Sequence, residues 1–407
     1  MRPLRIGILK PDYHIVGGFE RVVSRIESIL RTEGHTVERI TVDLRPPART
    51  GYGRTIPADV WYAAHEYFRY LYGRDVFEHL DTRSYDLVMS TQPPSFSHRH
   101  PRHLALFYHH QRVFYDLEDR YVQAGFVEDE AVHRAAAAHM RELDRPHLAA
   151  ITHYLTPSDT VADRLTRFNG RSDSGRFLAG IGVGDDRAAA ERPTRAGQVL
   201  CVGRHEFPKR VELLVAAAHL LAPSAEVTCI GGGSRLAWTR LLDHRFGTGE
   251  ADPAGLDDAE LWCNTGEVDG PDEVPDPAAG RMRLLGRVSD DELLTAYRDA
   301  TCVVAPALDE DYGLTAIEAM AHGRPVVVCR DGGGLAELVD DGVTGLVVDP
   351  DPTSLAAGVR RLLEDPDLAA ELGANGRERA RELSWEAAAV QLLDGVAATM
   401  DAAAPSR

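Results

Sequence analysis

Short apolar runs alternate with amphipathic helical patterns along the whole chain, and this alternation starts again near the middle. Such alternation is typical of parallel sheets covered by helices on both faces. A length of 407 residues also fits two domains better than one. The sequence therefore predicts an α/β fold with two successive doubly wound units. The expected strands are residues 4–9, 37–42, 87–89, 104–108 and 151–155, then 199–202, 227–230, 283–285, 301–305 and 326–329.

Two segments interrupt this alternation. Residues 180–197 are weak in apolar pattern, so we place the boundary there and expect domains at 1–183 and 184–383, followed by a last helix and tail at 384–407. Residues 247–280 are rich in Asp, Glu, Gly and Pro and almost without periodicity. They predict an acidic surface excursion whose role stays open, with a lid as one alternative.

Charge is distributed unevenly and restricts the partners. The chain has a net charge of −18, with +1 on residues 1–180 and −19 on residues 181–407. A strongly acidic half argues against a nucleic-acid partner, which requires a basic surface. No apolar run reaches the roughly 18 residues of a membrane helix, and no secretory signal is recognisable, so we expect a cytoplasmic protein without an integral membrane segment.

The first of three segments that suggest chemistry lies at residues 202–210, directly after an expected strand. Gly203 allows a sharp turn, so that Arg204 and Lys209 project from one loop at the carboxyl edge of the sheet, where doubly wound folds bind ligands. Two cations at this edge suit a diphosphate. The chain has 43 arginines but two lysines, Lys10 and Lys209, so a lysine in this loop stands out against the composition.

The second segment follows the fourth expected strand of the second unit and combines a loop, a glycine and a helix. Gly313 leaves its backbone open, so the amides of Leu314 and Thr315 at the helix start are expected to face an anion. Glu310 precedes this helix, and Glu318 lies about a turn along it. Carboxylates accept two hydrogen bonds at once and therefore suit the vicinal hydroxyls of a sugar and of a ribose.

The third segment, residues 286–292, is another turn from a strand to a helix, with Ser289 as the expected N-cap. We expect the backbone near Arg287 and Val288 to receive the base of a nucleotide. Together the three segments predict a site for an extended, phosphate-containing ligand in the second domain.

The stretch E-D-Y-G-L-T-A-I-E-A-M-A-H-G-R-P-V, residues 310–326, resembles the most specific motif of glycosyltransferase family 4, the retaining GT-B enzymes of the glycosyl transferase group 1 type. The resemblance extends from about residue 199 to the C-terminus, except for 247–280. It implies the GT-B fold, in which two Rossmann-like domains face a cleft and a C-terminal helix crosses back to the N-terminal domain. It also implies that Arg204 and Lys209 grip the diphosphate, Glu318 the ribose and Glu310 the transferred sugar, in a domain that binds the nucleotide sugar.

The first half resembles the family less closely and is implied to bind the acceptor. Gly17 and Gly18 begin a segment similar to the family's G-G-A-E-R, whose glycines approach the donor phosphates and the acceptor. The histidine that the family places beside the anomeric carbon corresponds to His109, with His110 as the rival. Two departures concern the second half: Arg210 follows Lys209 where members often have glycine, and Asp311 replaces a glycine after Glu310.

We therefore expect a retaining, hexosyltransferase-like enzyme that moves a sugar from a nucleotide-diphosphate sugar to a small acceptor such as a natural-product aglycone, an aminocyclitol or a sugar. The alternatives are a nucleotide-sugar 2-epimerase of GT-B fold, a transferase with a lipid-linked or polysaccharide acceptor, and a binding module without turnover. No metal is expected, because the D-x-D at residues 309–311 coincides with the glutamate motif. No cofactor is expected besides the donor. The acceptor, the donor base and sugar, and a homodimer stay open.

Overall fold

The structure is a computed structural model that describes residues 2–14, 17–44, 49, 55–180, 195–268 and 280–402. The chain divides into a first unit, Met1–Gly180 with Trp385–Arg407, and a second unit, Ile181–Ser384. The expected boundary between residues 183 and 184 lies outside the described residues. No helix in the described ranges has both the length and the apolar content of a membrane span.

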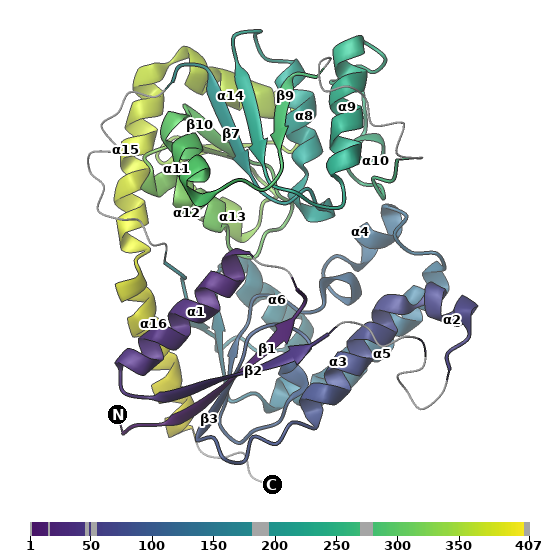
Figure 1. The fold of residues 1–407 in the computed structure, drawn as a ribbon, viewed down its shortest axis with the longest axis vertical. Helices are drawn as coiled ribbons and strands as arrows, with labels where there is room; N and C mark the ends of the chain where they lie inside the picture. The colour runs from purple at the N-terminus through teal and green to yellow at the C-terminus, as the bar shows by residue number, and fades with distance from the viewer. Residues whose placement is uncertain are drawn as a thin grey trace. The chain divides into compact units, whose positions relative to one another are not determined.

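The first unit is built on a six-stranded sheet whose strand order is β2-β1-β3-β4-β5-β6, with every pairing parallel (Figure 1). Strands β3 and β4 are buried along their whole length, as expected for a sheet covered on both faces. The strands are β1 (Arg5–Asp12), β2 (Thr36–Asp43), β3 (Leu87–Ser90), β4 (His103–Leu106), β5 (His153–Thr156) and β6 (Gly175–Arg176).

Helices of the first unit begin where polar residues cap them. Asp129 accepts a hydrogen bond from the Val132 amide at the start of α5, and Ser158 does the same for Val161 at the start of α6. The helices are α1 (Gly18–Thr32), α2 (Ala58–Ala63), α3 (His65–Glu78), α4 (Glu118–Gln123), α5 (Glu130–Ala150) and α6 (Asp159–Asn169), with short 3-10 turns η1 (Ser95–Ser97) and η2 (Arg112–Phe114).

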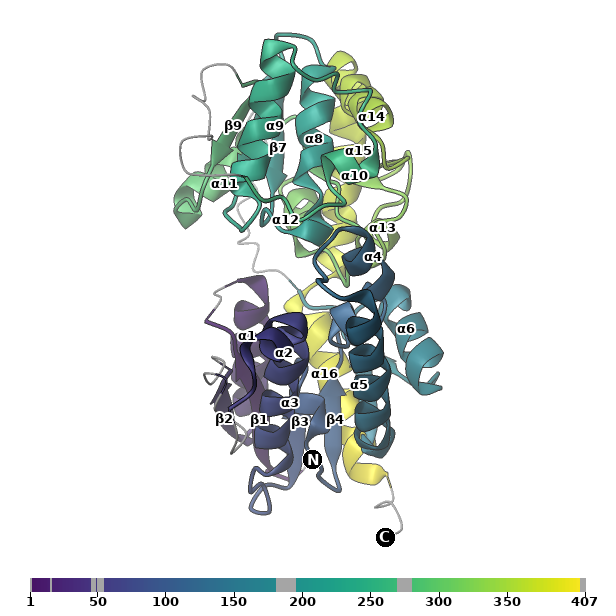
Figure 2. The ribbon, with the colours of Figure 1, turned by 90° about the vertical axis from the view of Figure 1, so that its right-hand side faces the viewer.

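The last helix, α16 (Trp385–Asp401), belongs to the first unit although the second unit precedes it in the chain. It packs on α1, β4 and β5 (Figures 1 and 2). The side chain of Gln391 accepts a hydrogen bond from the Leu178 amide (2.7 Å). Gly395 lies so close to Leu155 that a Cβ atom at this glycine would come within 2.8 Å of the leucine side chain.

The second unit contains another wholly parallel sheet, with the order β12-β11-β10-β7-β8-β9. Its first strand, β7, has neighbours on both sides, so the strand order reverses between β7 and β10. Doubly wound sheets bind ligands beyond the carboxyl ends of the strands at such a reversal. The strands are β7 (Gln198–Val202), β8 (Glu226–Ile230), β9 (Met282–Leu285), β10 (Cys302–Ala305), β11 (Val326–Cys329) and β12 (Gly345–Val348).

Helices cover this second sheet as well, which confirms the predicted pair of doubly wound units (Figure 2). The helix expected after Gly313 runs from Leu314 to Ala321, and a 3-10 turn precedes α8. The elements are η3 (Phe207–Lys209), α8 (Val211–His219), α9 (Leu236–Thr248), α10 (Asp258–Leu261), α11 (Asp290–Asp299), α12 (Leu314–Ala321), α13 (Gly334–Glu337), α14 (Pro352–Glu364) and α15 (Pro366–Glu382).

Candidate functional site

The loops after β7 and β10 lie side by side, because these two strands pair directly. The hydroxyl of Thr315, in the first turn of α12, donates to the carbonyl of Val202, the last residue of β7 (3.2 Å). The start of α12 is thereby tied to the loop that carries Arg204, which is exposed. The structure thus places the first and second predicted segments at one edge of the second sheet, at the reversal of strand order.

Lys209 and Glu310 form the contact between these two loops. The ammonium group of Lys209 is ion-paired with the Glu310 carboxylate, and both side chains remain partly accessible, at 28% and 21%. Lys209 ends the η3 turn, while Glu310 comes from the loop after β10. The sequence alone places both residues near a sugar diphosphate, and the structure brings their charged groups together.

The backbone of Glu310 is fixed by the glycine-rich segment 331–334. Its amide donates to the carbonyl of Gly332 (2.9 Å), and its carbonyl accepts from the amide of Gly334 (2.7 Å). Gly333 has a φ of +59°, and a Cβ there would meet the Glu310 carbonyl oxygen at 2.8 Å. Glycine is therefore required for this close approach. This glycine-rich segment thus holds Glu310 in place.

The N-terminus of α12 is accessible to a ligand. Gly313, Leu314 and Thr315 are all half-buried. Gly313 has a φ of +111°, and a Cβ there would lie 2.7 Å from Leu335. Because a helix start presents unpaired amides and a positive dipole end, these residues form an anion-binding element beside Lys209.

Glu318 lies further along α12 and has a partner that sequence reasoning missed. The hydroxyl of Tyr297, in α11, donates to a carboxylate oxygen of Glu318 (2.8 Å). Burial and the neighbouring Glu318 raise the pKa of Tyr297 well above its usual value, so this hydroxyl stays protonated as a donor. The ring of Tyr297 stacks on His322 with centroids 5.3 Å apart. Tyr297 belongs to the amphipathic pattern before β10, and that pattern does not indicate a hydrogen bond to Glu318.

The third predicted segment lies further along the same sheet edge. Arg287 and Val288 follow β9, which is separated from β7 by β8. The amide of Gly231, after β8, donates to the carbonyls of Leu285 and Gly286, and a Cβ at Gly231 would overlap the Gly203 carbonyl oxygen. The turns after β7, β8 and β9 therefore pack together.

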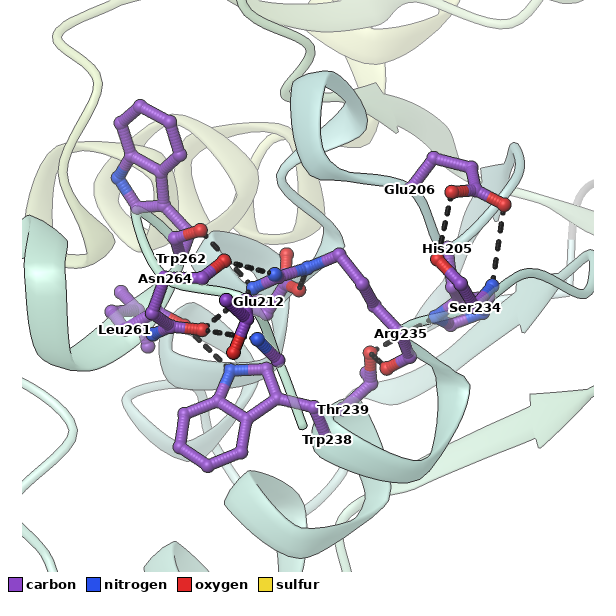
Figure 3. A network of polar contacts seen from close by, with 12 residues as sticks. His205, Glu206, Glu212, Ser234, Arg235, Trp238, Thr239, Leu261, Trp262 and Asn264 are labelled. Atoms are coloured by element: carbon purple, nitrogen blue, oxygen red, sulfur yellow. Dashed lines mark hydrogen bonds and ion pairs between the residues drawn. The ribbon is translucent and has the colours of Figure 1, made fainter. Parts of the chain in front are cut away.

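Residues 258–264 pack beneath the η3 turn that carries Lys209. The ring of Trp262, 1% exposed, lies 5.7 Å from that of Phe207 and 5.1 Å from the guanidinium carbon of Arg210. Arg235 is equally buried, and it donates to Glu212, to the Trp262 carbonyl (3.1 Å) and to the Asn264 carbonyl (2.5 Å). Figure 3 shows Arg235 reaching from the start of α9 into this network.

This network corrects the prediction for residues 261–263, whereas residues 247–260 are exposed or half-buried, as expected for a surface excursion. The segment was expected to be an acidic surface excursion, yet Leu261, Trp262 and Cys263 are all buried, and α10 begins with a capping box at Asp257. The buried guanidinium of Arg235 satisfies backbone carbonyls that an irregular segment would otherwise leave unpaired. Residues 269–279 lie outside the described residues.

The two glycines predicted in the first unit begin α1. Gly17 is its N-cap, and the side chain of Glu20 accepts from the Gly17 amide (2.9 Å). Glu20 is also paired with Lys10 (3.2 Å), whose ammonium group donates to Gln92 (3.0 Å) and is buried. Lys10 therefore fixes the turn of Gly17 and Gly18 against the end of β1.

The two rival histidines have different surroundings. His110 is 3% exposed, its ring stacks on Tyr115 at 4.2 Å, and burial lowers its pKa to about 4. One of its ring nitrogens lies 2.6 Å from the Asn169 side-chain oxygen. His109 is half-buried and lines a cavity of about 460 Å³ in the first unit. The geometry therefore favours His109 for contact with a ligand, and His110 for the core.

The D-x-D pattern at residues 309–311 forms no cation site in the described part of the chain, where no three His, Cys, Asp or Glu side chains are grouped as metal ligands. The amide of Asp309 donates to the carbonyl of Asp331 (2.8 Å). Asp309 has a φ of +47°, a conformation that Asp and Asn adopt more readily than other non-glycine residues.

Comparison with known proteins agrees with the motifs. Residues 278–379 match the model of the family "Glycosyl transferases group 1". Over 256 residues, or 58% of this chain, the sequence is 34% identical to D-inositol 3-phosphate glycosyltransferase 2 of Catenulispora acidiphila, of which 54% is covered. The chain thus spans about half the length of the curated relatives it matches.

Solved structures of similar fold cover nearly all of the chain. Sucrose-phosphate synthase from Thermosynechococcus elongatus superposes with a TM-score of 0.66 at 23% identity, over 96% of this chain and 98% of that one. Anabaena HepE, in complex with UDP and glucose, gives 0.60 at 14% identity, over 97% and 99%. At these identities the likeness shows the fold. The chain accordingly has the GT-B fold, and its residues 278–379 are similar to the group 1 glycosyltransferases.

Proposed function

We propose that this chain transfers a hexose-like sugar from a nucleotide-diphosphate sugar to a small acceptor, with retention of anomeric configuration and without a metal ion. The observation that carries the proposal is the Lys209–Glu310 pair beside the open N-terminus of α12, at the reversal of strand order in the second sheet. A cation and helix amides suit the diphosphate, and a carboxylate next to them suits the hydroxyls of the attached sugar.

In the proposed reaction the bond between the anomeric carbon and the diphosphate oxygen breaks while negative charge develops on the leaving group. Lys209, Arg204 and the amides of Leu314 and Thr315 stabilise that charge. The acceptor hydroxyl bonds to the anomeric carbon on the same face, and its proton passes to the departing phosphate oxygen. Retention then follows without a covalent sugar–enzyme intermediate.

The remaining predicted residues position the donor. Glu318, held by Tyr297, binds the ribose hydroxyls, and the turn at Arg287 and Val288 receives the base. Glu310 binds hydroxyls of the transferred sugar. His109 and the turn of Gly17 and Gly18 belong to the first unit. We assign the two glycines to the donor phosphates and the acceptor, and His109 to the anomeric carbon.

The first experiment identifies the donor. Wild-type chain is screened by thermal shift against UDP-, GDP-, ADP- and dTDP-linked hexoses, and one base is expected to raise the melting temperature most, because a ligand of the folded state stabilises it. Product analysis by NMR with an acceptor mixture then reports the anomeric configuration. If no nucleotide sugar stabilises the chain, the proposal fails. If the sugar is isomerised without acceptor, an epimerase replaces the transferase.

Substitution of Lys209 tests its role in the donor site. Lys209→Ala is expected to lower kcat/KM about 100-fold, because one fixed positive charge on the leaving group is lost. Lys209→Arg is expected to restore only part of this activity, since a planar guanidinium cannot reproduce the close ammonium contact with Glu310. Arg381→Ala, which removes an exposed ion pair with Glu378, is the matched control and should retain wild-type kcat/KM. Unchanged kinetics for Lys209→Ala would remove the residue from the site.

A further inference from the structure

The described residues that line the cavity beside His109 all belong to the first unit. The cavity measures about 460 Å³, within the range of sites that enclose a small organic molecule. Its walls come from the junction of α2 and α3, from the segment after β4 that ends in η2, and from the connection between α4 and α5. Segments far apart in the sequence thus surround one hollow next to the predicted catalytic histidine.

Aromatic rings make up much of its wall. Phe114 is buried and forms the inner side, where its ring lies 5.6 Å from that of His133. Tyr121 and Phe126 approach each other with ring centroids 5.2 Å apart, and both are half-buried. Tyr67 lines the cavity from α3. Aromatic walls of this kind bind apolar rings through their large contact area.

The charged groups around the cavity disfavour an anion. Two carboxylates, Glu66 and Glu128, line it. Of the described lining residues, Arg112 is the single one with a permanent positive charge, and its guanidinium lies 2.6 Å from the buried carboxylate of Asp116. Burial lowers the pKa of His133, which keeps that ring neutral. Glu66 is paired with Arg69 (3.0 Å) and with the ring of the lining residue His65 (3.4 Å). A phosphate in this cavity would therefore face the exposed carboxylate of Glu128 and cationic groups that already have carboxylate partners.

His109 offers an acceptor atom to a hydroxyl group. Its Nδ1 lies 2.6 Å from the carbonyl oxygen of His110, and a carbonyl can only accept, so Nδ1 carries the hydrogen. In the neutral ring Nε2 then has a lone pair for a hydroxyl of the bound molecule.

We propose that this aromatic cavity binds an uncharged acceptor that combines an apolar ring with a hydroxyl group directed at His109, and that it discriminates against phosphorylated acceptors. The inference rests on the proposed function where it names the occupant as the acceptor. It differs from the acceptor in the names of the curated relatives, which is an inositol phosphate.

Binding to the purified full chain is measured by calorimetry with phenyl β-D-glucoside and with myo-inositol 1-phosphate. The glucoside is expected to bind at least about tenfold more tightly. Phe126→Ala should weaken glucoside binding about tenfold, since part of an aromatic contact is lost. Val390→Ala, which truncates an exposed apolar residue of α16, is the control and should bind as wild type.

A charge reversal tests the discrimination itself. Glu128→Lys on the exposed rim should tighten inositol-phosphate binding several-fold, whereas Glu142→Lys on the exposed face of α5 should not. Equal or tighter binding of inositol phosphate to the wild type overturns the inference, as does undiminished glucoside binding by Phe126→Ala. The thermal-shift screen of donors tests a separate claim. If no nucleotide sugar stabilises the chain, the proposed function is wrong, whereas glucoside binding still tests the chemistry of the cavity.

Discussion

At the scale of single residues, Arg210 has a structural role that differs from the ligand-binding role proposed for its neighbour Lys209. It has a φ of +48°, a left-handed conformation. Its buried guanidinium donates to the carbonyls of Pro306 and Ala307 and to the carboxylate of Asp331. The side chain therefore joins the Lys209 turn to the loop of Glu310, which offsets the cost of the backbone conformation.

Substitution of Arg210 should therefore affect stability. Arg210→Ala is expected to lower the free energy of unfolding by about 2–4 kcal/mol, because Asp331 and two carbonyls lose their partner. Arg210→Gly should cost about 1 kcal/mol less, since glycine adopts the positive φ readily. Urea denaturation followed by circular dichroism gives both values. A glycine variant as stable as the wild type would limit the contribution of the guanidinium contacts to the roughly 1 kcal/mol that glycine gains from its backbone.

At the scale of elements, the segment that includes α10 supports the η3 turn that carries Lys209. Trp262 packs on Phe207, and Arg235 holds the Trp262 and Asn264 carbonyls (Figure 3). Lys209 follows Phe207 within the same η3 turn. The position of the Lys209 ammonium group thus depends on a tryptophan more than 50 residues further along the chain.

Removal of this support is expected to change donor binding more than folding. Trp262→Leu should weaken nucleotide-sugar affinity about tenfold, because the η3 turn loses the ring that packs against Phe207, and Lys209 then samples more positions. Trp238→Phe, which removes only the hydrogen bond to the Leu261 carbonyl (2.9 Å), is the control. Both are measured by donor titration alongside melting temperature. A lower melting temperature with unchanged donor affinity in Trp262→Leu would limit the residue to a structural role.

The sequence predicted the elements whose determinants are local. The strand, glycine and helix around Gly313 follow from apolar periodicity and turn chemistry within about 15 residues, and so does the α/β class. The burial of Trp262 was missed because its partner Arg235 lies outside any local window. The difference between His109 and His110 was equally hidden, since adjacent residues share one sequence window and only tertiary contacts, such as those of His110 with Tyr115 and Asn169, distinguish them.

At the scale of the whole molecule, buried histidines make stability depend on pH. Burial lowers the pKa of His103 to about 3 and that of His110 to about 4, below the ordinary 6.5 that applies in the unfolded chain. The unfolded chain therefore binds more protons as the pH falls from about 6.5 to 4. The stability that these neutral rings contribute is complete above pH 6.5 and is lost as the pH falls toward 4.

Melting temperatures should accordingly decrease from pH 7 to pH 5. His110→Phe keeps a ring against Tyr115 and removes one titrating group, so its melting temperature should fall less steeply over this range. Differential scanning calorimetry at half-unit steps provides the comparison. An identical slope for wild type and His110→Phe would contradict the assignment of His110 as a buried neutral ring.

The path of the chain through α16 has a consequence for the order of events during translation. The helix covers β4 and β5 of the first unit but is encoded after all of the second unit. Residues 1–180 therefore leave the ribosome before the helix that covers β4 and β5 has been made. All of the second unit is translated before α16 can pack on these strands. The first unit is thus translated first but completes its fold last. Nascent chains halted before residue 385 would expose the apolar face of β4 and β5 that α16 covers.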